Sequence, residues 1–130
     1  MKKKLTLGKN ERLKSQKQTE RLFSEGKRFA ITPFRIYYSI SKTETASLQF
    51  GAGVSKKNFR KAVDRNRIKR LMREAYRLQK TALENGVAEH PCRMTLFSLY
   101  TGKDLPEYRE VYDKTGKFVA KLCAIIRQPL

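Results

Sequence analysis

The sequence is short of the residues from which metal centres and nucleophilic active sites are usually built. It has one histidine, His90, and two cysteines, Cys92 and Cys123, which lie far apart and form no Cys-x-x-Cys pair. A centre built from cysteine and histidine needs more ligands than these, and His90 with Cys92 lacks a third residue that would complete a triad. We therefore predict no metal site and no catalytic residue in the protein itself, and two reduced thiols rather than a disulfide.

Long apolar segments are also absent. No run of about 18 apolar residues occurs, so no part of the sequence is predicted to span a bilayer. The first residues contain three lysines after Met1, but no apolar stretch of a signal peptide follows them. We expect these residues to form a basic arm, and we expect a cytoplasmic protein with no membrane attachment.

Acidic residues are scarce relative to basic ones. Twelve Asp and Glu stand against 30 Lys and Arg among 130 residues, which leaves a net charge of +18. This excess opposes compaction by self-repulsion and favours association with a polyanion. The length fits one domain, and an apolar share of 39% permits a single core. Nucleic acid is the leading candidate partner, ahead of an anionic membrane surface.

Hydrophobic periodicity predicts a single α/β domain over residues 15–130, preceded by the basic arm over residues 1–14. Helices are predicted over residues 15–25, 60–82 and between 106 and 127, and strands over 34–41, 48–54 and 94–100. Ser15 and Gln18 form a capping box at the start of the first helix, and Gly26 ends it. Asn85-Gly86 is expected to end the long helix, and a loop is expected over residues 87–93.

The first two predicted strands alternate with a period of two, which separates a core face from a second face. The core face would carry Phe34, Ile36, Tyr38, Ile40, Leu48, Phe50, Ala52 and Val54. The second face would present Arg35, Tyr37, Gly51 and Gly53. Two interpretations of it stay open: an exposed surface on which the glycines admit a nucleic-acid strand, or an ordinary surface ring beside a bulge or bend.

The segment from residue 56 to residue 80 carries half of the net charge. Its eleven basic and two acidic residues give +9. At about 100° per residue, an apolar stripe of Ile68, Leu71, Met72, Ala75, Leu78 and Ala82 lies opposite a cationic ridge of Asn66, Lys69, Arg70, Arg73 and Arg77, flanked by Arg65 and Arg67. A solvated helix would mix charge signs, whereas this ridge repels itself unless a polyanion neutralises it. Arginine also suits bidentate phosphate contact, so the ridge predicts RNA binding that weakens steeply with salt.

The ordered residues of the ridge resemble a known family. Arg65-Asn66-Arg67-Ile68-Lys69-Arg70-Leu71-Met72-Arg73 is similar to the Arg-Asn-Arg-x-Lys-Arg-x-x-Arg motif of the bacterial ribonuclease P protein component. Val54-Ser55-Lys56-Lys57 and Ala62-Val63-x-Arg65 match in register. Leu13-Lys14 and Leu22-Phe23-x-x-Gly26 resemble the start of the family's first helix. The resemblance covers about residues 12–78.

This resemblance implies a fold and a set of site residues. The fold would be an α-β sandwich in which helices pack a mixed sheet, with a left-handed crossover. The residues implied to contact the catalytic RNA are Lys56, Lys57, Arg65, Asn66, Arg67, Lys69, Arg70 and Arg73. The residues implied to line a cleft for the 5′ leader of precursor tRNA are Phe23, Tyr37, Ser55 and Lys56. Thr19 stands where many members have a second ring.

The resemblance also implies an activity and partners. Ribonuclease P is the endonuclease that removes the 5′ leader of precursor tRNA, and its RNA subunit performs the hydrolysis with bound magnesium. The implied partners are that catalytic RNA and precursor tRNA, with no protein partner and no metal held by the protein alone. Two alternatives remain: a ribosomal or other structural RNA-binding protein, and a metal-independent nuclease that acts alone.

Overall fold

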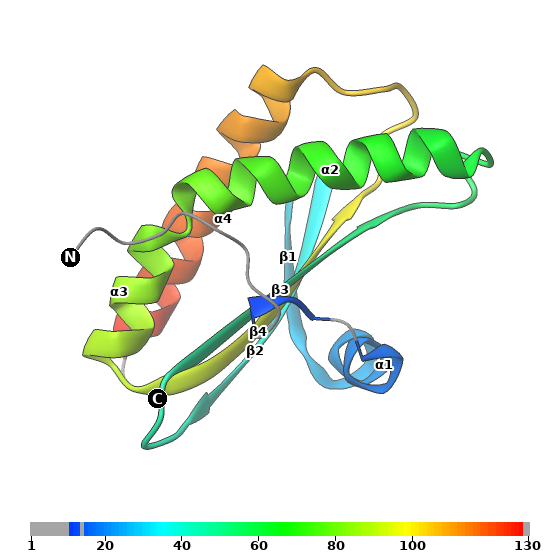
Figure 1. Cartoon of the computed structure of the whole chain (residues 1–130). Coiled ribbons are helices and arrows are strands. Elements are labelled where there is room, and N and C mark those ends of the chain that lie inside the picture. Colours follow the sequence, from blue (N-terminus) through cyan, green and yellow to red (C-terminus); the bar gives the residue numbers. More distant parts are fainter. Residues whose placement is uncertain (1–10, 14, 129–130) are drawn as a thin grey trace.

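The computed structural model describes residues 11–13 and 15–128 (Figure 1). In chain order the elements of this part are α1 (Gln16–Glu25), β1 (Lys27–Ile31), β2 (Phe34–Lys42), β3 (Ser47–Val54), α2 (Ala62–Gln79), α3 (Thr81–Glu89), β4 (Cys92–Tyr100) and α4 (Tyr108–Arg127). The strands form one sheet in the order β1-β2-β4-β3, in which only the β3–β4 pair is parallel. No helix of the described part is long and apolar enough to cross a membrane.

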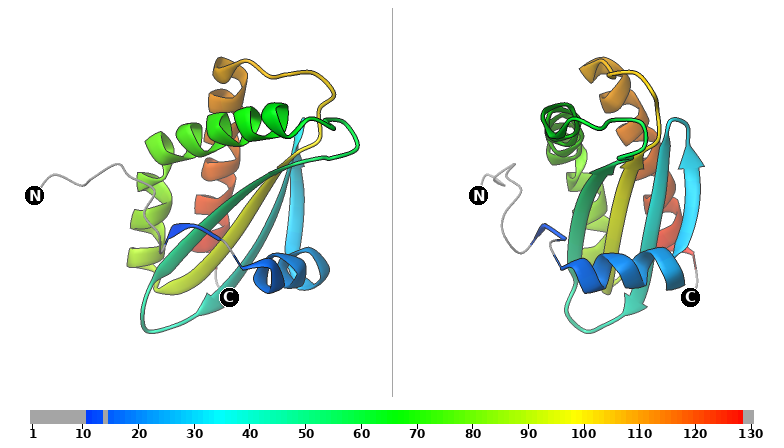
Figure 2. Two further views of the ribbon diagram at one scale, coloured as in Figure 1. Left: turned by 45° about the vertical axis from the view of Figure 1, so that its right-hand side comes forward. Right: turned by 90° about the vertical axis from the view of Figure 1, so that its right-hand side faces the viewer.

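The two faces of the sheet are covered unequally. α1 lies on one face, and α2, α3 and α4 lie on the other (Figure 2). The parallel strands β3 and β4 are joined through α2 and α3 across the face that carries three helices. In the right view of Figure 2, α1 is in front, β3 lies to the left of β4 and the connection runs behind the sheet. The crossover is therefore left-handed, which is rare and which confirms the fold that the resemblance implies.

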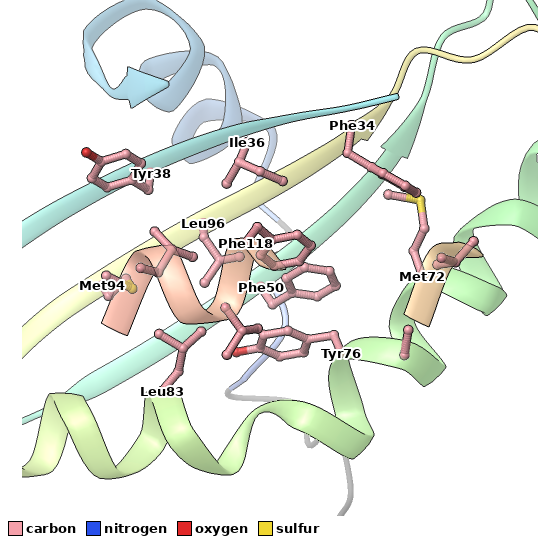
Figure 3. Packing of buried hydrophobic residues seen from close by; sticks show 14 of the residues in the cluster. Phe34, Ile36, Tyr38, Phe50, Met72, Tyr76, Leu83, Met94, Leu96 and Phe118 are labelled. Carbon is pink, nitrogen blue, oxygen red and sulfur yellow. The ribbon is translucent and has the colours of Figure 1, made fainter. Parts of the chain in front are cut away.

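The main core lies between the sheet and the three-helix layer. Phe34, Ile36 and Tyr38 of β2 and Phe50 of β3 are buried, as their alternation predicts. The Phe50 ring stacks on the ring of Tyr76, with 4.0 Å between centroids, and both lie beside Phe118 of α4 (Figure 3). Each such side chain stabilises the fold by about 1.5–3 kcal/mol through removal of apolar area from water.

The predicted long helix is wrong at its C-terminal end. α2 stops at Gln79, and α3 then includes Asn85-Gly86 and the first part of the predicted loop. The chain turns at Lys80, whose side chain is only 2% exposed and whose Nζ lies 2.5 Å from a carboxylate oxygen of Glu11. Leu78 and Ala82 of the predicted apolar stripe are exposed, and Tyr76 and Leu83 take the buried positions.

Strand β1 was not predicted. It is a five-residue edge strand that pairs only with β2, with Lys27 opposite Tyr38 and Ile31 opposite Phe34. None of its residues is fully buried, so the segment lacks the strong alternation by which a half-buried strand is recognised.

Packing of the domain begins before Ser15. The Leu13 amide donates a hydrogen bond to the Phe50 carbonyl oxygen at 2.9 Å, and the Leu13 side chain is buried. Arg12 forms a β-bridge with the same residue of β3. Residues 1–10 and 14 of the predicted basic arm lie outside the described residues. From Ser15 onward the prediction for α1 is confirmed, since Ser15 Oγ accepts a hydrogen bond from the Gln18 amide and Gly26 follows the last turn.

Candidate nucleic-acid interface

α2 presents the cationic ridge to solvent because its opposite side is anchored in the core. Ile68, Met72, Ala75 and Tyr76 are buried against the sheet and α4. On the other sides of the helix, Asn66, Arg67, Arg70 and Arg73 are exposed and Lys69 is half-buried. The structure thus places these residues where helical spacing predicts them, on one continuous outer surface.

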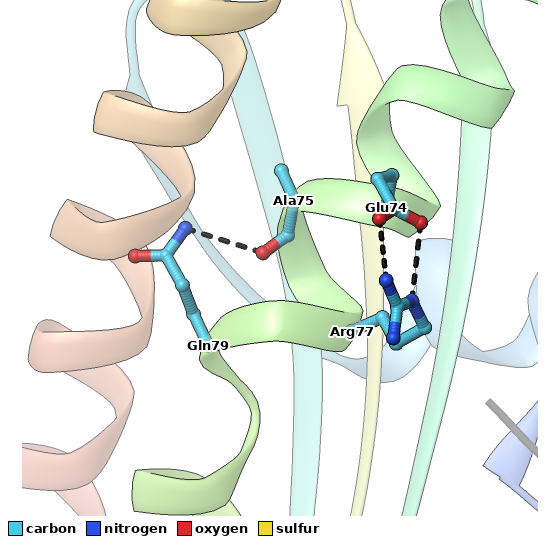
Figure 4. Close-up of polar contacts among 4 residues, drawn as sticks. All are labelled: Glu74, Ala75, Arg77 and Gln79. Carbon is cyan, nitrogen blue, oxygen red and sulfur yellow. Dashed lines mark hydrogen bonds and ion pairs between the residues drawn. The ribbon is translucent and has the colours of Figure 1, made fainter. Parts of the chain in front are cut away.

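Four cations of this surface have no acidic partner within residues 11–13 and 15–128. Arg67, Lys69, Arg70 and Arg73 form no ion pair with any residue of the described ranges. Arg77, the last member of the ridge, differs, because its Nε and Nη2 donate to the two carboxylate oxygens of Glu74 at 3.1 and 2.5 Å (Figure 4). This bond lowers the pKa of Glu74 and raises that of Arg77. Arg77 therefore contributes to the helix surface rather than to a free cationic site.

Arg65 is partly used within the protein. Its Nη1 donates to the carbonyl oxygens of Phe59 and Arg60, both at 2.8 Å, and so closes the β3–α2 loop at the start of the helix. Since a guanidinium has five N–H donors, this arrangement leaves others for a ligand. The bracing role was not predicted from the sequence.

Five cations meet where the N-terminal segment, the β3–α2 loop and α2 come together. Burial lowers the pKa of Lys69, and the positive charges of Arg73, Arg65 and Lys56 lower it further. The pKa of Arg73 is likewise lowered by burial and then by the charge of Arg12. We call Arg12, Lys56, Arg65, Lys69 and Arg73 the cationic cluster. Lys57 is exposed on the same loop. Such mutual repulsion is relieved by the phosphates of a nucleic acid.

The glycines of β3 have a different role from the one that either interpretation gave them. A Cβ on Gly51 or Gly53 would lie 2.8 or 2.5 Å from ring atoms of Phe97. The β3–β4 register also runs without interruption from Ser47 to Val54. The glycines therefore make room for the Phe97 ring of the neighbouring strand. The glycines thus do not provide space for an incoming nucleic-acid strand, and no bulge interrupts the pairing.

Three aromatic rings meet between α1 and this face of the sheet. The ring centroid of Phe23 lies 4.7 Å from that of Tyr37 and 5.1 Å from that of Phe97. Phe23 is 42% exposed and Phe97 is half-buried, but Tyr37 is only 7% exposed because α1 and Leu13 cover it. The expectation of an open-face Tyr37 is thus wrong. We call Phe23, Tyr37 and Phe97 the aromatic cluster, in which Tyr37 supports the two rings that reach the surface.

The other predicted cleft residues lie outside this cluster. Ser55 and Lys56 follow β3 directly, half-buried and exposed respectively, with Lys56 part of the cationic cluster. Thr19 carries no ring, and its hydroxyl donates to the Ser15 carbonyl within α1. The residues that were missed are Phe97 and Leu99, whereas alternation had already placed Arg35 on this face. Alternation along residues 94–100 could have placed Phe97 and Leu99 opposite the core face, and the register sets exposed Arg35 directly across from Leu99.

The described part of the chain contains no group of three or more His, Cys, Asp or Glu side chains that would hold a metal ion. The residues that are present there do not fit a magnesium site. Cys92 and Cys123 form no disulfide, and burial raises the pKa of both thiols. The chemistry that this surface offers is binding of an extended polyanion beside exposed rings.

Comparison with known proteins agrees with this geometry. The model of the family described as Ribonuclease P matches residues 7–122. The ribonuclease P protein component of Porphyromonas gingivalis is 40% identical over 106 residues, which cover 81% of this chain and 77% of that protein. Two solved structures share the fold at 22% identity. The ribonuclease P protein of Staphylococcus aureus has a TM-score of 0.64, with 92% of this chain and 100% of that chain covered. That of Thermotoga maritima has a TM-score of 0.65, with 85% and 96% covered.

Proposed function

The chain belongs to the ribonuclease P protein family, and from that premise we propose how its surface divides the binding of two RNAs. Membership makes the chain a subunit of the endoribonuclease ribonuclease P, which acts in tRNA processing and in which the protein has an RNA partner. This decides against a ribosomal or structural RNA-binding protein and against a nuclease that acts alone. The geometry of the protein supports the proposal that two different surfaces bind the two RNAs.

The catalytic RNA binds, in this proposal, to the outer surface of α2 and the adjacent cationic cluster. The observation that carries the proposal is that Arg67, Lys69, Arg70 and Arg73 project from one helix without an acidic partner in the described ranges. Arginine contacts phosphate bidentately, and every neutralised phosphate releases counterions and so drives binding. Asn66, exposed among these cations, supplies a neutral donor and acceptor for a ribose or a base edge. Lys56, Lys57 and Arg65 extend the contact at the start of the helix.

The 5′ leader of precursor tRNA binds to the other face, over the aromatic cluster. Phe23 and Phe97 offer ring surface to unpaired bases, and buried Tyr37 holds Phe23 in place. Stacking on rings is tolerant of sequence, as a subunit that serves many precursors requires. Arg35, exposed beside Leu99, supplies a phosphate contact on the β1 side, while Ser55 and Lys56 contact the leader on the side of α2.

Hydrolysis and magnesium binding belong to the RNA subunit in this proposal. Magnesium is held by RNA phosphates, and the protein assists by neutralising phosphates that would otherwise repel one another. No side chain of the protein takes part in the chemical step. A cytoplasmic location, expected from the sequence, is part of the same proposal.

Reconstitution with a catalytic RNA at low magnesium tests the proposal. We expect the protein to increase cleavage of precursor tRNA and to bind precursor more tightly than mature tRNA. Lys117→Gln removes an exposed cation from α4. It is the control for variants that remove one cation from α2, and it should behave as the wild type. Equal affinity for precursor and mature tRNA would remove the leader assignment, and RNA binding that is insensitive to changes in α2 would remove the assignment of the catalytic RNA.

A further inference from the structure

A groove runs along the flank of α2 that faces away from the cationic cluster. Arg67 and Leu71 of α2 form one wall, and Leu105, Pro106 and Tyr108 of the β4–α4 connection form the other. Its volume is about 440 Å³. In Figure 1 this connection passes beside the N-terminal half of α2 on its way from the sheet to α4. None of these residues except Arg67 has a role in the proposed function.

The walls of the groove are apolar and partly open to solvent. Leu105 is 49% exposed, and Leu71 and Tyr108 are half-buried. Isolated exposed leucines are common on protein surfaces. Here, however, the exposed leucine forms the rim of a concave, apolar site of the size that small ligands occupy. The groove therefore fits a flat apolar group better than it fits a phosphate.

The charged residues around the groove indicate which kind of molecule carries this flat apolar group. Arg67 lines the groove and is also an exposed cation of the α2 surface, and neighbouring Arg70 is exposed too. Neither forms an ion pair with a described residue. At the other rim stands the exposed carboxylate of Glu107, which repels a phosphate but accepts hydrogen bonds from an amino group.

We propose that this groove binds one unpaired nucleobase of the RNA partner, while the phosphates beside that base contact Arg67 and Arg70. The base lies between Leu105 and Leu71 against the Tyr108 ring, and an exocyclic amino group donates to Glu107. The proposal rests on the proposed function, because it places the base on the same RNA that binds α2. It adds a site that reads an unstacked base, which is the usual way in which proteins recognise single-stranded RNA.

Leu105→Ser tests the groove, and Leu78→Ser is its matched control. Leu78 is a leucine of α2 with similar exposure, 40%, and it does not line the groove. We expect Leu105→Ser to weaken binding to the catalytic RNA roughly ten- to hundredfold, the range for loss of one buried apolar side-chain contact. The slope of log affinity against log salt should stay unchanged, because no phosphate contact is lost. Leu78→Ser should bind as the wild type, and equal melting temperatures show that both variants are folded.

Chemical probing of the RNA supplies a second readout. One base that the wild-type protein protects should become reactive in the Leu105→Ser complex and stay protected in the Leu78→Ser complex. Wild-type affinity of Leu105→Ser, or equal losses in both variants, would overturn the groove assignment. So would self-association of the wild type that Leu105→Ser abolishes, because the groove would then hold a second copy of the chain.

A third variant separates this inference from the proposed function. Arg70→Gln should weaken binding and flatten the salt dependence in the same titration, because it removes a phosphate contact. If Arg70→Gln behaves in this way while Leu105→Ser binds normally, only the groove proposal fails. If Arg70→Gln has no effect, the assignment of α2 to the catalytic RNA fails with it.

Discussion

Both halves of α2 carry polar side chains, but the two ends of the helix use them differently. In the C-terminal half, Arg77 is bonded to Glu74, and Gln79 Nε2 donates to the carbonyl oxygen of Ala75 at 3.2 Å (Figure 4). Gln79 Nε2 also donates to the Tyr112 carbonyl oxygen of α4 at 2.9 Å. In the N-terminal half, Arg67 and Arg70 have no acidic partner among the described residues. Arg77 and Gln79 near the C-terminal end are paired within the protein, and Arg67 and Arg70 are left for a ligand.

This difference shows what separates a structural cation from an RNA-binding one. The presence or absence of an acidic partner decides it, and the number of charges does not. By composition Arg70 and Arg77 are equivalent members of one ridge. The structure shows that Arg77 pairs with Glu74 three residues earlier in the same helix, and that Gln79 ties α2 to α4. The C-terminal half should therefore respond to mutation mainly in stability, and the N-terminal half mainly in RNA affinity.

The largest effect should come from the C-terminal half. Tyr76→Ala removes a ring that is 1% exposed and stacked on Phe50, and deletions of buried aromatic side chains cost about 3–5 kcal/mol of unfolding free energy. Urea denaturation measures this loss. Tyr76→Phe retains the ring and serves as the control. A loss below about 1 kcal/mol for Tyr76→Ala would mean that this half does not anchor the helix.

A smaller effect should appear at Phe97, which extends the contrast to the sheet. Phe97→Leu keeps an apolar side chain over Gly51 and Gly53 but removes the ring that would stack on a base. We expect the free energy of binding to precursor tRNA to become less favourable by about 1–3 kcal/mol, and the free energy of binding to mature tRNA to stay unchanged. Competition binding with both RNAs checks this result. Equal losses for the two RNAs would indicate damage to the fold rather than to a leader site.

A still smaller effect should mark the cationic cluster in the absence of RNA. Arg73→Gln removes a charge that repels Lys69 and lies near Arg12. Relief of like-charge repulsion on a helix is worth about 0.2–0.5 kcal/mol, so the free protein should become slightly more stable at low salt. Thermal melts at two salt concentrations detect the gain, which should shrink as salt rises. Destabilisation at low salt would show that Arg73 has a structural partner.

The smallest effect concerns pH. The hydrogen bond from Arg77 lowers the pKa of Glu74 in the folded protein, so Glu74 stabilises the fold at pH values above its unfolded pKa of about 4.3. This contribution is lost as the pH falls through the lower, folded pKa. Glu74→Gln should therefore be slightly less stable than the wild type at neutral pH, and the difference should vanish in acid. A difference that is independent of pH would mean that the ion pair contributes nothing.

The parts of the molecule that depend on local pattern were predictable from the sequence. Ser15 and Gln18 cap α1, alternation buries Phe34 and Ile36, and helical spacing places Arg70 opposite Ile68. Each of these features is determined by residues within a few positions of one another. The sequence was therefore sufficient to predict the helix that carries the motif and the core face of the sheet.

The predictions that failed concern features that depend on contacts between residues far apart in the sequence. The break between α2 and α3 is held by Lys80 and Glu11, which are 69 residues apart. The exposure of Tyr37 was misjudged because Leu13 and α1 cover it, and the role of Gly53 depends on Phe97 of another strand. Periodicity contains no information about which strands become neighbours. The aromatic cluster could therefore only be completed from the structure.

The central claim, that the N-terminal half of α2 binds RNA through unpaired cations, is tested most directly by salt titration of binding to the catalytic RNA. The variants are Arg67→Gln, Arg70→Gln and Arg77→Gln. The account predicts that each of the first two lowers the slope of log affinity against log salt by about 1, while Arg77→Gln leaves the slope at the wild-type value. Equal slopes for all three variants, or a change at Arg77 alone, would contradict it.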